Sequence, residues 1–312
     1  MVYVASCSLD APTADALEVV LCEYVRSCWT LTQIRAGEPY TLAGYFDSPE
    51  AVAAGWAELQ SDFPSLPAEY TIKELADRDW QEAYKDFLEP WAHGGLHWVP
   101  EWQRATYPVP AGEAVVYFDA GMAFGTGSHP TTRLMARRLL DYRNACLGAD
   151  ATAAIQTTAN DPRLASPRLI DAGCGSGILA ISAAQVGFRQ LYAFDQDPES
   201  VTVSLENETR NGLAVGTIEV CHAGLETGLA GRQADLMLAN IIFDVLVIYR
   251  ETLLAATAPG GWLCLSGILA TELESVTDAF REAASLVWQA EAAAIDSRTD
   301  GEWADLRLVR AG

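Results

Sequence analysis

The feature that most constrains the fold is the segment from residue 168 to 187, RLIDAGCGSGILAISAAQVG. An apolar run ends at Asp171, glycines follow at positions 173, 175 and 177, and an apolar helix is predicted over 178–186. Glycines in such a turn let backbone amides approach a ligand at the carboxyl edge of a parallel sheet, where doubly wound folds bind nucleotides. The segment therefore predicts an α/β fold with a ligand site at Gly173 and Gly175.

A second predicted strand, residues 190–194, leads into an acidic residue, Asp195, which lies 22 residues beyond Gly173. An acid at this separation can accept hydrogen bonds from the hydroxyls of a ribose. Asp195 could instead cap the helix that begins at Pro198, but Asp197 is better placed for that role. We assign the ribose to Asp195 and the cap to Asp197, so the sequence predicts a cofactor that contains adenosine.

The spacing of the glycines favours one such cofactor over others. The turn is G-x-G-x-G, and Ile178 stands where NAD or FAD sites need a third glycine. No Gly-Lys-Ser/Thr follows to hold the phosphates of a nucleotide. S-adenosylmethionine, which has no phosphate, suits this turn better.

Two other segments suggest where a second substrate would bind. The apolar segment 235–243 ends by exposing Asn240, which offers a side-chain carbonyl beside its backbone carbonyl as acceptors for an amine. Judged by spacing alone, Asn240 would usually be a turn residue at the end of a strand. The glycine-rich stretch 118–132 precedes a helix predicted over 134–140, which is typical of a loop that covers a ligand. Thr131 and Thr132 are candidates to cap that helix.

The chain is predicted to form two domains joined by a linker. Strands near 2–6, 29–34, 40–46 and 70–75, with helices near 14–26 and 49–60, give residues 1–76 a β-α-β-β-α-β order, which indicates a small ferredoxin-like α+β domain. Residues 77–105 begin with a helix and then contain several Pro and Gly, which indicates the linker, with His93 and His97 on its surface. Residues 106–312 alternate strands and helices around a parallel sheet, and 147–167 is expected to be a surface insertion.

Charge and cysteine content exclude several classes of function. The chain has 42 Asp and Glu against 20 Lys and Arg, a net charge of -22, which disfavours nucleic-acid binding and favours a basic protein as partner. Acidity that serves only solubility would explain the charge as well.

Seven scattered cysteines form no C-x-x-C pair, so we expect neither a disulfide framework nor a metal site. The first residues do not resemble a signal peptide, and Pro259-Gly260-Gly261 interrupts the uncharged stretch 252–271, so we expect a cytoplasmic monomer without a membrane span.

Several motifs resemble those of the PrmA methyltransferases, which modify protein eleven of the large ribosomal subunit. These motifs are GMAFGTGSHPTT, DAGCGSGILAI, FDQDP, LANI and LSGIL, in the order and approximate spacing of the family, and the match covers most of residues 77–310. The resemblance implies a seven-stranded Rossmann-like methyltransferase domain whose last hairpin pairs 286–295 with 303–309. It also implies cofactor contacts from Thr132, Gly173, Asp195 and Asn240, and recognition of the ribosomal protein by the N-terminal domain.

The expected reaction is transfer of a methyl group from S-adenosylmethionine to a lysine or N-terminal amine of a protein, with Asn240 as the catalytic residue that orients the amine. A methyltransferase acting on another protein or on a small-molecule amine is the nearest alternative. An NAD-binding oxidoreductase and a non-catalytic binding module are alternatives of other classes.

Overall fold

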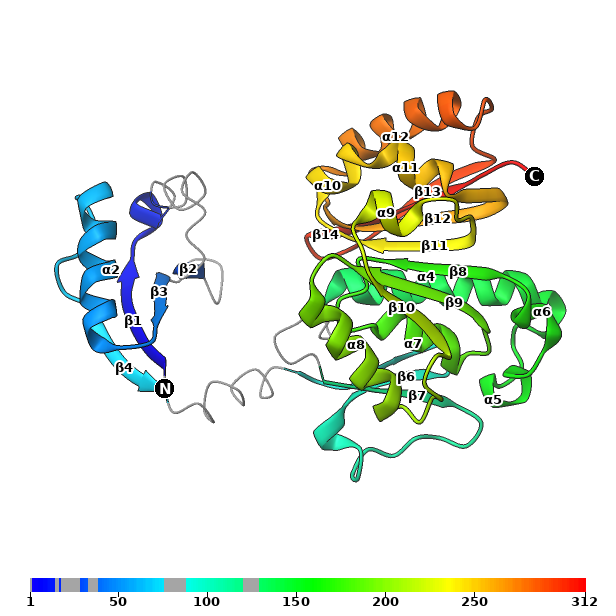
Figure 1. The fold of residues 1–312 in the computed structure, drawn as a ribbon, viewed down its shortest axis with the longest axis horizontal. Helices are drawn as coiled ribbons and strands as arrows, with labels where there is room; N and C mark the ends of the chain where they lie inside the picture. The colour runs from blue at the N-terminus through cyan, green and yellow to red at the C-terminus, as the bar shows by residue number, and fades with distance from the viewer. Residues whose placement is uncertain (1, 15–16, 18–28, 33–38, 76–87, 120–128) are drawn as a thin grey trace. The chain divides into compact units, whose positions relative to one another are not determined.

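The computed structural model describes residues 2–14, 17, 29–32, 39–75, 88–119 and 129–312 (Figure 1). The chain divides into two compact units, Met1–Phe87 and Leu88–Gly312. The helix predicted at the start of the linker falls on residues 76–87, which lie outside the described residues. The rest of the predicted linker, from Leu88 onward, belongs to the second unit.

The first unit is a four-stranded antiparallel sheet in the order β2-β3-β1-β4, with α2 packed on β1 and β3. Its elements are β1 (Val2–Leu9), β2 (Trp29–Thr32), β3 (Tyr40–Phe46), α2 (Pro49–Asp62) and β4 (Thr71–Leu75). The backbone NH of Ala51 donates to the Ser48 hydroxyl over 3.1 Å, which caps α2 as its sequence predicts. This strand order is the predicted ferredoxin-like arrangement, although its first helix, 14–26, lies almost wholly outside the described residues.

The second unit is built on a seven-stranded sheet in the order β10-β9-β8-β11-β12-β14-β13. The first five of these strands are parallel, and β14 runs antiparallel to both of its neighbours. The strands are β8 (Arg168–Ala172), β9 (Gln190–Asp195), β10 (Ile218–His222), β11 (Ala234–Asn240), β12 (Thr257–Leu269), β13 (Ala294–Asp300) and β14 (Trp303–Val309). The central strands are almost continuously apolar because helices cover both faces of the sheet, and the predicted seven-stranded α/β fold is confirmed.

Two groups of helices cover the sheet (Figure 1). One face carries α4, α7 and α8, of which α7 contacts both of the others, and the other face carries α9, α10, α11 and α12. Their bounds are α4 (Pro130–Leu147), α7 (Ile178–Gln185), α8 (Pro198–Arg210), α9 (Leu225–Leu229), α10 (Phe243–Ile248), α11 (Arg250–Ala255) and α12 (Leu273–Val287). Among the described residues, none of the helices has the length and apolar character needed to cross a bilayer.

Residues 88–118 form a small sheet that belongs to the second unit. It consists of β5 (Trp91–His93), β6 (Leu96–Pro100) and β7 (Ala114–Phe118), with the short 3-10 helix η2 (Glu101–Gln103) after β6. The expectation that His97 lies on a linker surface is wrong, because its ring is buried between the Tyr107 hydroxyl, 2.8 Å from Nδ1, and the Glu113 carboxylate. The neighbouring Trp98 is also buried, and its indole NH donates to the Ser182 hydroxyl on α7 over 2.8 Å.

The Ala- and Thr-rich stretch 147–167 is partly buried rather than confined to the surface. It folds into η3 (Gly148–Asp150), α5 (Ile155–Thr158) and α6 (Pro162–Ala165). Ile155 and Leu164 are buried, and Thr158 accepts a hydrogen bond from the buried guanidinium of Arg143 on α4. The insertion therefore contributes to the core beside α4.

The last hairpin begins later than the resemblance implied. Leu286 belongs to α12, which runs to Val287 because Val276, Phe280 and Ala284 bury one helical face, and the first arm of the hairpin is β13. The second arm, β14, has the expected bounds of 303–309.

Buried ion pairs fix this hairpin to α4. Arg138 is fully buried and donates to the carboxylates of Asp305 on β14 and Asp296 on β13. Burial alone would lower the pKa of Arg138, but the hydrogen bonds to these carboxylates outweigh it and raise the pKa, so the guanidinium stays charged.

Candidate functional site

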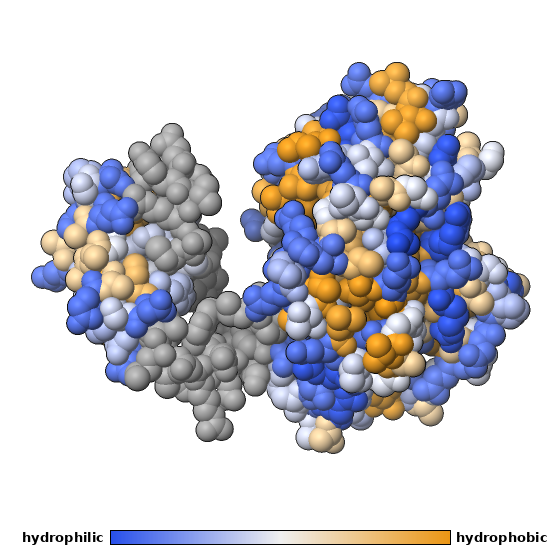
Figure 2. All heavy atoms as spheres, in the orientation of Figure 1, coloured by the Kyte–Doolittle hydropathy of each residue, from blue (hydrophilic) through white to orange (hydrophobic). Residues whose placement is uncertain are grey.

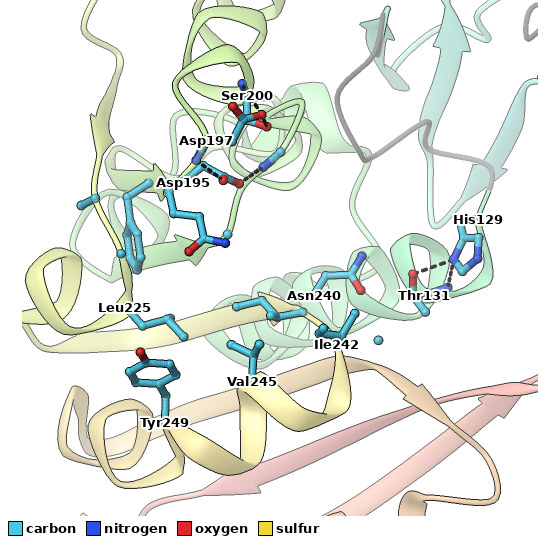
Figure 3. A pocket seen from close by; sticks show the side chains of 18 of the residues that line it. His129, Thr131, Asp195, Asp197, Ser200, Leu225, Asn240, Ile242, Val245 and Tyr249 are labelled. Carbon is cyan, nitrogen blue, oxygen red and sulfur yellow. Dashed lines mark hydrogen bonds between the residues drawn. The ribbon is translucent and has the colours of Figure 1, made fainter. Parts of the chain in front are cut away.

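A cavity of about 690 Å³ opens at the carboxyl ends of the parallel strands (Figure 3). Residues from the ends of β8, β9, β10 and β11 form most of its wall, and α10 and the start of β14 complete it. Its lining residues are His129, Thr131, Gly173, Gly175, Phe194, Asp195, Gln196, Asp197, Ser200, Ala223, Gly224, Leu225, Asn240, Ile241, Ile242, Val245, Tyr249, Gly267 and Trp303. Four of the five predicted cofactor-binding residues, Gly173, Gly175, Asp195 and Asn240, are thus brought together.

The turn takes its shape because its glycines carry no side chains. Gly173 and Gly175 both have positive φ angles, 70° and 53°. A Cβ atom on Gly173 would lie 3.0 Å from the Ile241 side chain, at the floor of the cavity. The NH groups of Gly173 and Cys174 both donate to the carbonyl of Phe194, over 2.9 and 3.0 Å, which ties the turn to the end of β9.

Asp195 and Asp197 have different roles in the structure. The NH of Gly175 donates to one carboxylate oxygen of Asp195 over 2.9 Å, and the NH of Asp197 donates to the other over 3.0 Å. Each oxygen keeps a further acceptor position, and the carboxylate lines the cavity (Figure 3). Asp197 accepts from the NH groups of Glu199 and Ser200, which confirms it as the N-cap of α8.

Asn240 ends β11 and lines the cavity. Among the described residues, its Oδ1 atom is buried without a hydrogen-bond partner, although the residue lines the cavity. Its neighbour Ile241 donates its NH to the carbonyl of Ser266 over 3.0 Å, which fixes the backbone where β11 ends. Gly267 follows, and a Cβ atom there would lie 2.3 Å from the Ile241 carbonyl, so only glycine allows this close approach.

Thr132 lies behind the cavity wall, and Thr131 contributes to the wall instead. The Thr132 hydroxyl is buried and has no partner within the described part of the chain. Neither threonine caps α4, because the N-cap is His129, whose Nδ1 accepts from the NH of Thr131. Residues 120–128 of the predicted covering loop lie outside the described residues.

Beneath the turn lies a buried acid, Asp171, which ends the apolar run of β8. It accepts a hydrogen bond from the NH of Ala180 over 3.0 Å, and it is almost fully buried. Burial raises the pKa of Asp171 to about 7, because a charged carboxylate is poorly solvated there. Asp171 thus supports the start of α7 from below and does not line the cavity.

The sequence reasoning missed the residues that close the cavity. Ala223, Gly224 and Leu225 follow β10, and Tyr249 and Trp303 come from α10–α11 and from β14. The position of 223–225 just after a parallel strand was the signal that could have identified them. Trp303 offered no such signal, because its ring reaches the cavity only through the pairing of β14 and lies against His129, with ring centroids 4.9 Å apart.

The donor set fits S-adenosylmethionine better than a metal or a phosphate-bearing cofactor. The Asn240 side-chain carbonyl, which has no partner among the described residues, suits an ammonium or amine, and the Asp195 carboxylate suits ribose hydroxyls. Apolar side chains of Leu225, Val245 and Phe194 lie around the remaining space and suit an adenine ring. No group of three or more possible metal ligands occurs among the described residues.

Comparison with known proteins adds independent findings. Residues 18–310 match the model of a family described as ribosomal protein L11 methyltransferase (PrmA). A ribosomal protein L11 methyltransferase of Chromohalobacter salexigens is 38% identical over 239 residues, which cover 76% of this chain and 71% of that protein. One of Symbiobacterium thermophilum is 33% identical over 278 residues, 85% of this chain and 82% of that protein. The crystal structure of a ribosomal protein L11 methylase from Lactobacillus delbrueckii subsp. bulgaricus is similar with a TM-score of 0.54, at 26% identity, over 70% of this chain and 96% of that one.

Proposed function

The chain belongs to the ribosomal protein L11 methyltransferase (PrmA) family, and from this premise we propose that it transfers methyl groups from S-adenosylmethionine to lysine or N-terminal amines of ribosomal protein L11. The observation that carries the proposal is the Asn240 side-chain carbonyl at the wall of the cavity, which is buried and has no hydrogen-bond partner in the part of the chain that the structure describes. A buried acceptor without a partner is costly unless a ligand supplies the donor. An N–H group of the acceptor amine or of the cofactor is such a donor.

The residues around the cavity account for cofactor binding. S-adenosylmethionine, when bound, supplies a methyl group on a sulfonium, which is open to attack by an amine. The Asp195 carboxylate would hold the ribose hydroxyls. Because Gly173 and Gly175 have no side chains, the cofactor could approach their backbone closely. Thr132 and Asn240 would bind the polar groups of its amino-acid part.

The acceptor amine must be neutral to act as a nucleophile. A free lysine has a pKa of about 10.4, so most of it is protonated at pH 7. A site that excludes water disfavours the ammonium form, and the Asn240 side-chain carbonyl with the Ile241 backbone carbonyl can then accept the remaining N–H groups. This orientation directs the nitrogen lone pair at the methyl group. The rate of methyl transfer is then raised by positioning the two reactants, and no dedicated base is needed.

The charge of the chain supports a basic protein as substrate. With a net charge of -22, the enzyme would attract a basic ribosomal protein and repel bare nucleic acid. We assign recognition of that protein to residues 1–76, methyl transfer to residues 106–312 and the connection to 77–105, and we propose a cytoplasmic monomer. Because β5 and β6 pack within the second unit, the part of the connection from Leu88 onward forms part of the catalytic body.

A radiolabelled methyl-transfer assay tests this function. Purified enzyme is incubated with labelled S-adenosylmethionine and a mixture of ribosomal proteins from the large subunit, and the products are separated by mass. We expect label on L11 alone, with S-adenosylhomocysteine bound much more tightly than NAD in parallel titrations. Label on another protein would identify a different substrate, and tighter binding of NAD would overturn the proposal.

A further inference from the structure

Three large apolar side chains stand exposed at the mouth of the cavity. Ile242 and Ile248, at the two ends of α10, are 66% and 68% exposed, and Leu269 at the end of β12 is 37% exposed. We call these three residues the apolar rim. Scattered exposed apolar residues are ordinary, but a group beside a ligand site commonly marks an interaction surface.

The rim is continuous with the wall of the site. Ile242 is the N-cap of α10, and Val245 and Ile248 follow at intervals of three, so each lies near the next one on the surface. Ile242 and Val245 both line the cavity. Figure 3 shows Ile242 and Val245 on the same side of α10, below Asn240. Leu269 is paired in register with Trp303, another lining residue, and β12 contacts α10.

Acidic side chains accompany the apolar rim. Asp244 is exposed on α10 between Ile242 and Ile248, and Glu226 is exposed next to the lining residue Leu225. Glu272 lies beside Leu269 and accepts a hydrogen bond from its backbone NH over 2.8 Å. Figure 2 shows hydrophobic surface over α10 with hydrophilic surface around it. The mouth therefore combines aliphatic contact area with negative potential, which suits a basic polypeptide.

We propose that the apolar rim docks the segment of the protein substrate that flanks the acceptor amine, with an aliphatic side chain of that segment seated on Ile248 and Leu269. The inference rests on the proposed function and deepens it by naming what the substrate presents near the modified residue. Ile242 and Ile248 are six positions apart along α10, a rise of about 9 Å, which about three residues of extended chain would span. A short extended segment of the substrate is therefore long enough to run along the rim from Ile242 to Ile248.

A paired set of variants tests the rim with the intact enzyme and L11. The double variant Ile248→Asn with Leu269→Asn removes apolar contact from two residues that do not line the cavity. The matched control is Val215→Asn with Leu286→Asn. Val215, in the turn before β10, is 87% exposed, and Leu286, on α12, is 71% exposed. We expect the rim variant to raise KM for L11 about tenfold, as the loss of two buried aliphatic contacts implies. Its affinity for S-adenosylhomocysteine and its thermal midpoint should match those of the control.

A charge variant adds an independent readout. Asp244→Lys should raise KM for L11 most strongly at low ionic strength, since salt screens exposed charges.

The outcomes separate the docking surface from the proposed function. A wild-type enzyme that fails to methylate L11 would refute the proposed function itself. If the wild type is active and the rim variant keeps its KM, the docking surface is refuted. Reduced affinity for S-adenosylhomocysteine in the rim variant would point to a covering segment of this chain, and a changed sedimentation coefficient would point to a second copy, so either outcome would also overturn the proposal.

Discussion

At the scale of single residues, Asn240 is where a substitution should separate catalysis from folding. Its side-chain carbonyl has no partner among the described residues, so Asn240→Ala removes no intramolecular hydrogen bond of that atom. We expect methyl transfer to fall about a hundredfold, comparable to the loss of one preorganised polar group in other active sites. The free energy of unfolding, measured by denaturant titration, should change by less than about 1 kcal/mol.

The exposed Asn160, which lies outside the cavity, provides the control for this measurement. Asn160→Ala should leave both rate and stability unchanged. Full activity of Asn240→Ala would remove Asn240 from the mechanism. A large loss of stability in Asn240→Ala would show that the residue is structural instead.

Asp171 predicts a dependence of stability on pH. The pKa of Asp171 is raised to about 7 from a usual value near 3.8, so the unfolded chain releases this proton at lower pH than the folded protein does. Its contribution to stability is complete below about pH 4 and is lost as the pH rises towards 7. Asp171→Asn keeps an acceptor for the NH of Ala180 and removes the titration. The free energy of unfolding of the variant, relative to the wild type, should therefore rise by at least about 1.4 kcal/mol between pH 5 and pH 8.

An acid whose pKa is shifted the other way supplies the comparison. Hydrogen bonds from Arg163 lower the pKa of Asp161 to about 2, so it is ionised throughout that range. Replacing Asp161 by Asn should shift stability by the same amount at pH 5 and pH 8. Parallel stability curves for Asp171→Asn and the wild type would show that Asp171 is already ionised in the folded protein.

The site residues that could be predicted are those set by local chain geometry. Gly173, Gly175 and Asp195 follow from a strand, a turn and the next strand, and the structure brings them to one cavity with Asn240. Trp303 and Tyr249 could not be predicted, because they reach the cavity only through the pairing of β14 and the packing of α10 and α11. Their roles depend on contacts between distant parts of the chain, which a sequence pattern does not encode.

At the scale of elements, α4 depends on a buried charge for its attachment to the last hairpin. Arg138→Met leaves the fully buried carboxylate of Asp305 without its guanidinium partner. Breaking one side of such a pair costs about 3–5 kcal/mol. We expect the free energy of unfolding, measured with denaturant, to fall by that amount. Cofactor affinity should fall too, because the N-terminus of α4 carries His129 and Thr131 into the cavity.

Two further variants show whether the missing partner is the cause. Arg163 pairs with Asp150 and Asp161 on the surface, so Arg163→Met should lower the free energy of unfolding far less than Arg138→Met does. Adding Asp305→Asn to Arg138→Met removes the stranded charge and should recover part of the loss. If Arg138→Met were as mild as Arg163→Met, the pair would not anchor the helix.

Elements with a clear period were predicted better than those with mixed patterns. Strand β3 has the bounds predicted from its sequence, and β14 has those that the resemblance implied. The resemblance placed the first arm of the last hairpin too early, because Leu286 is still part of α12, which runs to Val287. Strand β6 was read as linker because Gly94, Gly95 and Pro100 surround it, yet all five of its residues are buried.

At the scale of the whole molecule, the cavity belongs to one unit alone. All of its lining residues lie between His129 and Trp303, within Leu88–Gly312. A fragment of residues 88–312 should therefore fold and bind S-adenosylhomocysteine with a Kd within about threefold of the full chain, which corresponds to less than about 1 kcal/mol. Its kcat/KM for L11 should fall by a larger factor if residues 1–76 recognise the protein. Calorimetric titration and the methyl-transfer assay provide the two measurements.

A fragment that begins at residue 106 is the natural comparison. It lacks β5 and β6, and with them the buried Trp98 and its hydrogen bond to Ser182 on α7. We expect this shorter fragment to be less stable than 88–312. Equal stability of the two fragments would place the boundary at 105/106, as the sequence alone suggested. Failure of 88–312 to bind S-adenosylhomocysteine would show that the first unit contributes to the cofactor site.

The position of β14 in the sheet has a consequence for biosynthesis. This strand comes last in the chain but inserts between β12 and β13, and it carries Trp303 to the cavity. While its residues are still inside the exit tunnel of a translating ribosome, β12 and β13 have no strand to join them and the ligand space lacks one side. Nascent chains should thus acquire the ability to capture their ligand only after residues 303–309 have left the tunnel, so that no half-made enzyme competes for it.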